Sequence, residues 1–138
     1  MNGIVVDASV ALAWCFPDEV SKYADSVLLA IENQNIIVPA IWPVEITNAL
    51  LVGERRKRIR QPDVRRFVEL LKGLDVTVET LSVADSIRNI FPLAQDYRLS
   101  AYAAAYLDVA VRHEVTLATL DADLHRAANA MGIAIFKA

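Results

Sequence analysis

The sequence contains few of the residues that break regular structure, and only one that can form a disulfide. Its 138 residues include four glycines, five prolines and a single cysteine, Cys15. One cysteine excludes an internal disulfide, so the chain has no need of an oxidising compartment. Sparse glycine and proline in a chain that is 55% hydrophobic also exclude a disordered or low-complexity protein. The composition is that of one globular domain.

Long apolar runs and an excess of positive charge are missing as well. The longest apolar stretch, residues 36–44, contains two prolines and is far too short to span a membrane. Asp7 interrupts the N-terminus before the apolar stretch of a signal peptide could develop. We therefore expect a cytoplasmic protein that makes no membrane contact. A net charge of −3 argues against nonspecific nucleic-acid binding driven by overall charge, although a local basic strip can still contact RNA.

Short β-branched runs alternate with segments that carry apolar residues at helical spacing. Strands are expected at residues 4–6, 36–38, 76–78, 116–119 and 133–136. We expect Ser9 to cap the first helix, and Pro92 to kink or interrupt the helix that begins after Ser82. The other helices are expected at residues 18–32, 43–58, 62–73, 100–113 and 122–131. This alternation predicts a single α/β domain over residues 1–138, with a central parallel five-stranded sheet and helices on both faces.

Three acidic residues are expected at one rim of that sheet. Asp7 ends the first strand, Asp121 directly follows the fourth, and Glu45 lies in the first turn of the helix after the second. In open parallel sheets, ligands bind beyond the carboxyl ends of the strands, where strand order reverses. Oxygen ligands that converge without His or Cys favour Mg²⁺ or Mn²⁺ over zinc. The three residues are therefore a candidate site for a divalent cation.

Each of these acids also has a purely structural interpretation. Asp7 and Asp121 could cap the helices that follow them, and Glu45 could complement its helix dipole. For a single residue the two interpretations stand level. The expected convergence of all three residues favours the functional one.

Four short motifs occur in order along the chain. They are Val6-Asp7-Ala8-Ser9, Pro43-Val44-Glu45-Ile46-Thr47-Asn48, Leu99-Ser100-Ala101-Tyr102 and Thr119-Leu120-Asp121-Ala122-Asp123-Leu124. Together they resemble the ordered motif set of VapC-type PIN domains, and the match extends from Asp7 to Leu124. The resemblance implies a PIN-like fold and a metal-dependent endoribonuclease, the toxin of a type II toxin–antitoxin system.

The resemblance also assigns roles to individual residues. It implies that Asp7, Glu45 and Asp121 are catalytic acids that hold Mg²⁺ or Mn²⁺. The metal would lower the pKa of a bound water and neutralise charge that develops on the scissile phosphate. Ser9, Asn48 and Thr119 match polar residues that orient these acids or the water; the alternative is that they make ordinary capping or turn hydrogen bonds.

One residue departs from the family pattern. The pattern has an aspartate directly after the tyrosine of the third motif, and this chain has Ala103 there. Asp108 lies about 140° further around the helix, so it cannot substitute for the missing acid. Asp96 and Asp123 are no better placed. We therefore expect an impaired or inactive nuclease. The intact remainder of the motifs favours a substitution introduced so that a toxic protein could be expressed, and a naturally degenerate copy is the alternative.

Basic and aromatic residues outside the acidic site have two interpretations. The densest positive cluster consists of Arg55, Arg56, Lys57, Arg58 and Arg60, and Arg65 and Arg66 continue it. It could contact an RNA backbone, but a solvated helix end is the favoured interpretation. The aromatic residues, Tyr102 and Tyr106 among them, are expected in the core or an interface rather than stacked on bases.

The resemblance further implies partners. VapC-like proteins are held inactive by a VapB-type antitoxin, cleave RNA and commonly form homodimers. The apolar helices at residues 18–32 and 43–58 are the candidates for a groove that receives the antitoxin. The main alternative function is a non-catalytic PIN-like module that binds RNA or protein and retains antitoxin binding; Ala103 is the feature that supports it.

Overall fold

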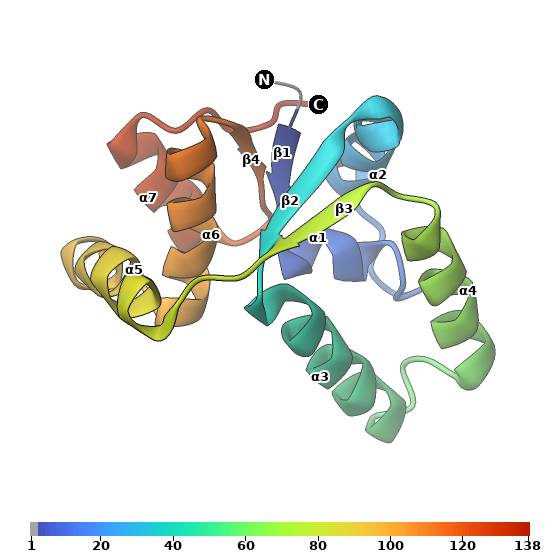
Figure 1. The fold of residues 1–138 in the computed structure, drawn as a ribbon. Coiled ribbons are helices and arrows are strands. Elements are labelled where there is room, and N and C mark those ends of the chain that lie inside the picture. Colours follow the sequence, from blue (N-terminus) through green and yellow to red (C-terminus); the bar gives the residue numbers. More distant parts are fainter. Residues whose placement is uncertain (1–2) are drawn as a thin grey trace.

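A parallel sheet of four strands forms the centre of the molecule, as seen in the computed structural model, which describes residues 3–138. Its order is β3-β2-β1-β4, and every neighbouring pair is parallel (Figure 1). The strands are β1 (Gly3–Val6), β2 (Asn35–Pro39), β3 (Val76–Glu79) and β4 (Thr116–Ala118). The predicted α/β fold with a parallel sheet is confirmed.

Burial follows the position of each strand in the sheet. Ile4, Val5 and Val6 of β1 are almost fully buried, because a central parallel strand is covered on both faces. The edge strand β3 is only half buried, and Val78 is 45% exposed. The continuous β-branched run in β1 thus marks the middle of the core.

Helices cover both faces of the sheet. Helices α5, α6 and α7 lie on one side, and α1 and α2 lie on the other, with α3 and α4 extending beyond the sheet (Figure 1). Their bounds are α1 (Ala8–Ala13), α2 (Lys22–Ala30), α3 (Ile41–Arg55), α4 (Gln61–Lys72), α5 (Val83–Tyr97), α6 (Ala101–His113) and α7 (Ala122–Met131), with a 3₁₀ turn η1 (Ile31–Asn33) after α2. Within residues 3–138, none of these helices is long and apolar enough to cross a membrane.

The sheet has four strands rather than the five that the sequence pattern predicts. The segment 133–136 contributes only an isolated parallel bridge between Leu117 and Ile135. Two backbone hydrogen bonds of 2.9 Å, from Leu117 to Ala134 and from Phe136 to Leu117, hold it beside β4. The segment therefore lies along the free edge of β4 without forming a strand of its own.

Local chemistry corrects three further predictions. Asp7 caps α1, not Ser9, and the helix begins at Ala8. Helix α5 continues through Pro92; this residue is exposed, so the carbonyl group left unpaired one turn earlier can be hydrated. Helix α2 begins at Lys22 instead of residue 18, because Ser21 accepts a hydrogen bond from the backbone N–H of Ala24.

The sheet order also locates the site. The chain moves from β1 outward to β2 and β3, then returns through α5 and α6 to β4 on the other side of β1. Strand order therefore reverses between β1 and β4, and their carboxyl ends lead to Asp7 and Asp121. A ligand is therefore expected beyond the carboxyl ends of β1 and β4.

Candidate functional site

Asp7 is held at the end of β1 by hydroxyl groups from two parts of the chain. Its Oδ1 accepts hydrogen bonds from Ser9 Oγ (2.5 Å) and from the backbone N–H of Val10 (3.2 Å). Its Oδ2 accepts from the hydroxyl of Thr119, which follows β4. The side chain is only 4% exposed. Ser9 and Thr119 therefore hold the Asp7 carboxylate in place, and their role in supporting a catalytic acid stays a prediction.

Burial raises the pKa of the Asp7 carboxyl above its ordinary value. The hydrogen bonds from Ser9, Thr119 and Val10 act in the opposite direction, and the negative charge of Asp121 adds to the rise. The two acids line the same pocket, although 114 positions separate them in the sequence. A cation placed between them would relieve that repulsion.

Asp121 combines a capping role with a place in the site. It is the N-cap of α7, and its Oδ1 accepts from the backbone N–H groups of Asp123 (2.8 Å) and Leu124 (3.1 Å). Its own N–H donates to the Thr119 hydroxyl (2.9 Å). Thr119 thus links Asp7 and Asp121 directly. The structural interpretation of Asp121 is correct, and it leaves the other carboxylate oxygen available.

Glu45 reaches the site from α3. The helix begins at Ile41, so Glu45 lies in its second turn rather than in the first turn that the sequence suggested. Tyr106 of α6 donates its hydroxyl hydrogen bond to Glu45 Oε1. Tyr106 is 3% exposed, and burial together with the Glu45 carboxylate raises the pKa of its phenol. The pair joins α3 to α6 across the site.

One pocket contains all three predicted acids. It has a volume of about 210 Å³, and Asp7, Glu45 and Asp121 line it together with Ser9. Ala103 lines the same pocket, so the position where the family pattern has an acid does face the other three. Ser100 caps α6 by accepting from the N–H of Ala103 (3.1 Å), which fixes the first turn there.

The pocket offers the type of ligand atom that a hard divalent cation prefers, but too few of these atoms are arranged to hold one. Only oxygen donors surround the pocket, as Mg²⁺ and Mn²⁺ prefer. However, no group of three or more His, Cys, Asp or Glu side chains in residues 3–138 is arranged to hold a metal ion as it stands. Both carboxylate oxygens of Asp7, and one oxygen each of Glu45 and Asp121, already accept hydrogen bonds from the protein. An incomplete set agrees with the presence of Ala103.

No other acid replaces the missing one. Asp108 is buried on another face of α6, where Arg112 binds it through contacts of 2.9–3.1 Å. Asp96 is exposed near the end of α5, and Asp123 pairs with Arg126 at 2.7 Å. These placements agree with the expectation from helical spacing.

Two predictions about polar residues fare differently in the structure. Asn48 is exposed on α3 and does not line the pocket, so the structure does not bring it to the acids. Tyr106, in contrast, is buried in the core as expected, and its hydroxyl also contacts Glu45. Its position three residues after Ala103, on the same helical face, was the signal that could have identified it.

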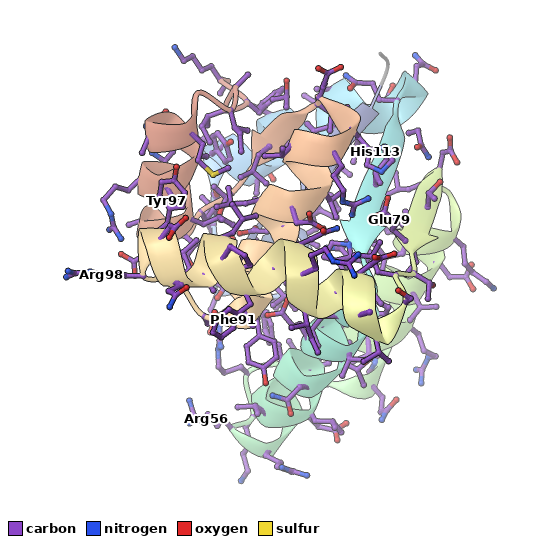
Figure 2. The ribbon with its side chains drawn as sticks, turned by 60° about the vertical axis from the view of Figure 1, so that its left-hand side comes forward. Arg56, Glu79, Phe91, Tyr97, Arg98 and His113 are labelled. Carbon is purple, nitrogen blue, oxygen red and sulfur yellow. The ribbon has the colours of Figure 1, made fainter. Side chains whose placement is uncertain are left out.

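The basic strip lies at the opposite end of α3 from Glu45. Arg55 is ten residues further along the helix, about 15 Å away. Arg58 has a structural role: it binds Asp18 (2.9 Å) and Glu19 (3.1 Å) and lies 4.3 Å from the centre of the Phe16 ring. Arg56 projects from this end of the molecule (Figure 2), and Arg55 and Arg60 are also exposed.

A family model matches most of the sequence. The model describes the PIN domain, and it covers residues 4–130. The chain belongs to the PIN domain family. The motif resemblance is thereby confirmed over nearly the whole length of the protein.

Individual relatives extend the comparison. This PIN domain is 28% identical to Ribonuclease VapC3 of Pyrobaculum aerophilum over 121 residues, which are 88% of this chain and 91% of that one. The crystal structure of PAE2754 from Pyrobaculum aerophilum has a TM-score of 0.66 at 24% identity and covers 91% of this chain and 85% of its own. That of FitAcB from Neisseria gonorrhoeae has a TM-score of 0.64 at 17% identity and covers 97% and 96%. Both structures share the fold.

Proposed function

We propose that this PIN domain is a metal-dependent endoribonuclease of the VapC type, the toxin of a toxin–antitoxin pair in the cytoplasm, and that Ala103 impairs it. The observation that carries the proposal is the single pocket in which Asp7, Glu45, Asp121 and position 103 meet. The similarity to Ribonuclease VapC3 supports RNA as the substrate.

Asp7, Glu45 and Asp121 are the residues that would hold Mg²⁺ or Mn²⁺. A bound divalent ion lowers the pKa of water and neutralises charge on a phosphate. The chain itself contributes the orientation: Ser9 and Thr119 fix both oxygens of Asp7, and Tyr106 fixes Glu45. Asn48 has no part in this arrangement in the structure, so its proposed role is limited to contacts outside the pocket.

A VapB-type antitoxin is the proposed protein partner. Helices α3 and α4 enclose a hollow of about 180 Å³ whose apolar lining includes Leu50, Leu51 and Val64. This hollow lies between α3 and α4, and we propose it as a docking place beside the expected groove of residues 18–32 and 43–58, which stays a prediction. The exposed Arg55 and Arg56 at the end of α3 could meet acidic residues of the antitoxin.

Restoring the missing acid tests the proposal. The chain and its Ala103→Asp variant are incubated with RNA and Mg²⁺, with and without a chelator. We expect the variant to cleave at least about tenfold faster, which corresponds to about 1.4 kcal/mol of transition-state stabilisation. Asp7→Asn in the restored background should abolish this cleavage.

Ala101→Asp is the matched control. It adds the same charge to the same first turn of α6, but Ala101 does not line the pocket. Equal and robust cleavage by the chain, the Ala103→Asp variant and this control would refute our account of the site.

A non-catalytic binding module is the second candidate. It is favoured for this exact chain because the acids of the pocket, within residues 3–138, are not arranged to hold a metal ion as they stand. Titration of the chain with Mn²⁺, followed by RNA binding in a chelator, separates the two candidates. RNA binding by the chain, with no cleavage even after Ala103→Asp, supports the binding module.

A further inference from the structure

A second, larger hollow adjoins the acidic pocket. Its volume is about 880 Å³, within the range of roughly 300–1,000 Å³ that is typical of ligand sites. Asp121 lines both this hollow and the acidic pocket. Thr119 lines it too, while its hydroxyl contacts Asp7. The two cavities are thus neighbours that share one wall, the segment between β4 and α7.

Two polar side chains of α7 line this hollow and contact each other. His125 and Asn129 are one helical turn apart, and Asn129 Nδ2 lies 3.2 Å from His125 Nδ1. This contact uses one ring nitrogen and sets the orientation of the imidazole. The Nε2 edge of the ring and the amide oxygen stay available for hydrogen bonds. Paired donor and acceptor groups of this kind can read the edge of a nucleobase.

The opposite wall is apolar and aromatic. The segment after α7 passes β4 and runs back toward α2 (Figure 1), and Phe136 meets Tyr23 there in an edge-to-face contact of 5.9 Å between ring centres. The Tyr23 hydroxyl donates to the carbonyl of Phe136 (2.8 Å), which holds this wall in place. Half-buried rings offer a surface on which an unpaired base can stack.

Lys137 supplies positive charge at the rim of the hollow. It is exposed, whereas the neighbouring cation Arg126 of α7 already pairs with Asp123. A base-sized hollow with hydrogen-bonding groups, aromatic rings and one cation matches the chemistry of a single-stranded nucleotide. A peptide would not require the combination of stacking surface and phosphate contact.

From these features we propose that the hollow lined by Tyr23, His125, Asn129, Phe136 and Lys137 is a base-binding subsite for an unpaired nucleotide next to the scissile phosphate. This inference rests on the proposed ribonuclease function. An RNA strand that places a phosphate at the acids passes over Leu120 and Asp121 and then enters the hollow. The subsite would select the base beside the cleavage point.

Binding of short RNA tests the subsite without cleavage. Labelled single-stranded 12-mers of U, A and C are titrated with the chain in a chelator, and the Kd is read from fluorescence anisotropy. We expect the parent chain to bind one of the three oligomers most tightly. The double variant His125→Ala/Asn129→Ala should raise the Kd for that oligomer about fivefold or more, so that the three Kd values become similar. Lys137→Ala should raise the Kd for all three oligomers by the same factor and reduce the dependence of binding on salt concentration.

Gln95→Ala is the control, because it truncates an exposed amide on α5, outside the hollow. It should leave every Kd unchanged, and circular dichroism should show that all variants are folded. If the double variant binds all three oligomers with the same Kd values as the parent chain, the proposed subsite is wrong. If Ala103→Asp cleaves RNA while the double variant keeps the same base preference, the subsite fails and the nuclease stands. If Ala103→Asp neither cleaves nor binds RNA, both fail.

Discussion

At the scale of single residues, hydroxyl groups govern the acidic pocket. Each carboxylate oxygen of Asp7 has a hydroxyl donor, and Glu45 has the phenol of Tyr106. Such supporting hydrogen bonds fix the direction of a metal ligand, and their loss typically lowers metal affinity 10–100-fold. The pocket therefore depends on Ser9, Thr119 and Tyr106 as much as on the acids.

Removal of the Tyr106 hydroxyl tests this dependence. Tyr106→Phe keeps the buried ring but leaves Glu45 without its donor. We expect the affinity for Mn²⁺, measured by calorimetry in the Ala103→Asp background, to fall by roughly 10–100-fold, while the free energy of unfolding falls by only about 1 kcal/mol. Tyr102→Phe is the control, because Tyr102 lines the same pocket and is 60% exposed. An unchanged Mn²⁺ affinity in Tyr106→Phe would show that the hydroxyl does not position Glu45.

At the scale of elements, a charged cluster joins the end of β3 to α6. Glu79 binds Arg112 and His113, and Arg112 also binds the buried Asp108 at 2.9 Å. Glu79 and His113 face each other between the two elements (Figure 2). Burial acts to raise the pKa of Glu79, but the hydrogen bonds from Arg112 and His113 outweigh it, so the pKa lies below its ordinary value. The cluster anchors an edge strand that is otherwise half exposed.

The depressed pKa of Glu79 makes its contribution to stability dependent on pH. The contribution is fully present above the pKa of the unfolded chain, about 4.3. It is lost as the pH falls through the lower pKa of the folded protein. Glu79→Gln should therefore lower the free energy of unfolding by about 1 kcal/mol at pH 6, and the difference from the parent should vanish toward pH 3.

Urea unfolding of both proteins between pH 6 and pH 3 measures this difference. Glu69→Gln is the matched control, because Glu69 pairs with Lys72 at 3.4 Å on the exposed surface of α4. It should change stability little at any pH. A Glu79→Gln effect that stays constant down to pH 3 would contradict the assigned direction of the shift.

At the scale of the whole molecule, one helix presents an apolar stripe to solvent. Val83, Ile87 and Phe91 recur every four residues on α5 and are 79%, 62% and 62% exposed. Phe91 points away from the helix and from the sheet (Figure 2). Exposed apolar residues at this spacing are suited to a protein–protein contact, and the homodimer that the family resemblance implies would bury them.

A charged residue in the stripe should separate the copies. We expect the chain to sediment as a dimer and Ile87→Glu/Phe91→Glu to sediment as a monomer with unchanged circular dichroism, because the charges would have to be desolvated at the contact. Val20→Glu is the control, since Val20 is 90% exposed but lies before α2, outside the stripe. A parent chain that is monomeric at all concentrations would end this proposal.

The sequence alone determined the features that depend on local pattern. The β-branched runs predicted all four strands, and Asp7 and Asp121 were correctly placed after two of them. The motifs also identified the family, whereas the departure at Ala103 stays a prediction. Local pattern was less reliable at ends and edges: it extended segment 133–136 into a strand and gave the cap of α1 to Ser9 instead of Asp7.

Only the tertiary structure decided which side chains meet. The Thr119 hydroxyl contacts Asp7 across 112 positions, Tyr106 contacts Glu45 across 61, and Arg58 binds Asp18 across 40. Periodicity gives the face on which a residue lies, but not the partner that packing brings to that face. The pairing of donors with carboxylates depends on how two helices and two strand ends come together, and that is settled by the packing of the whole core.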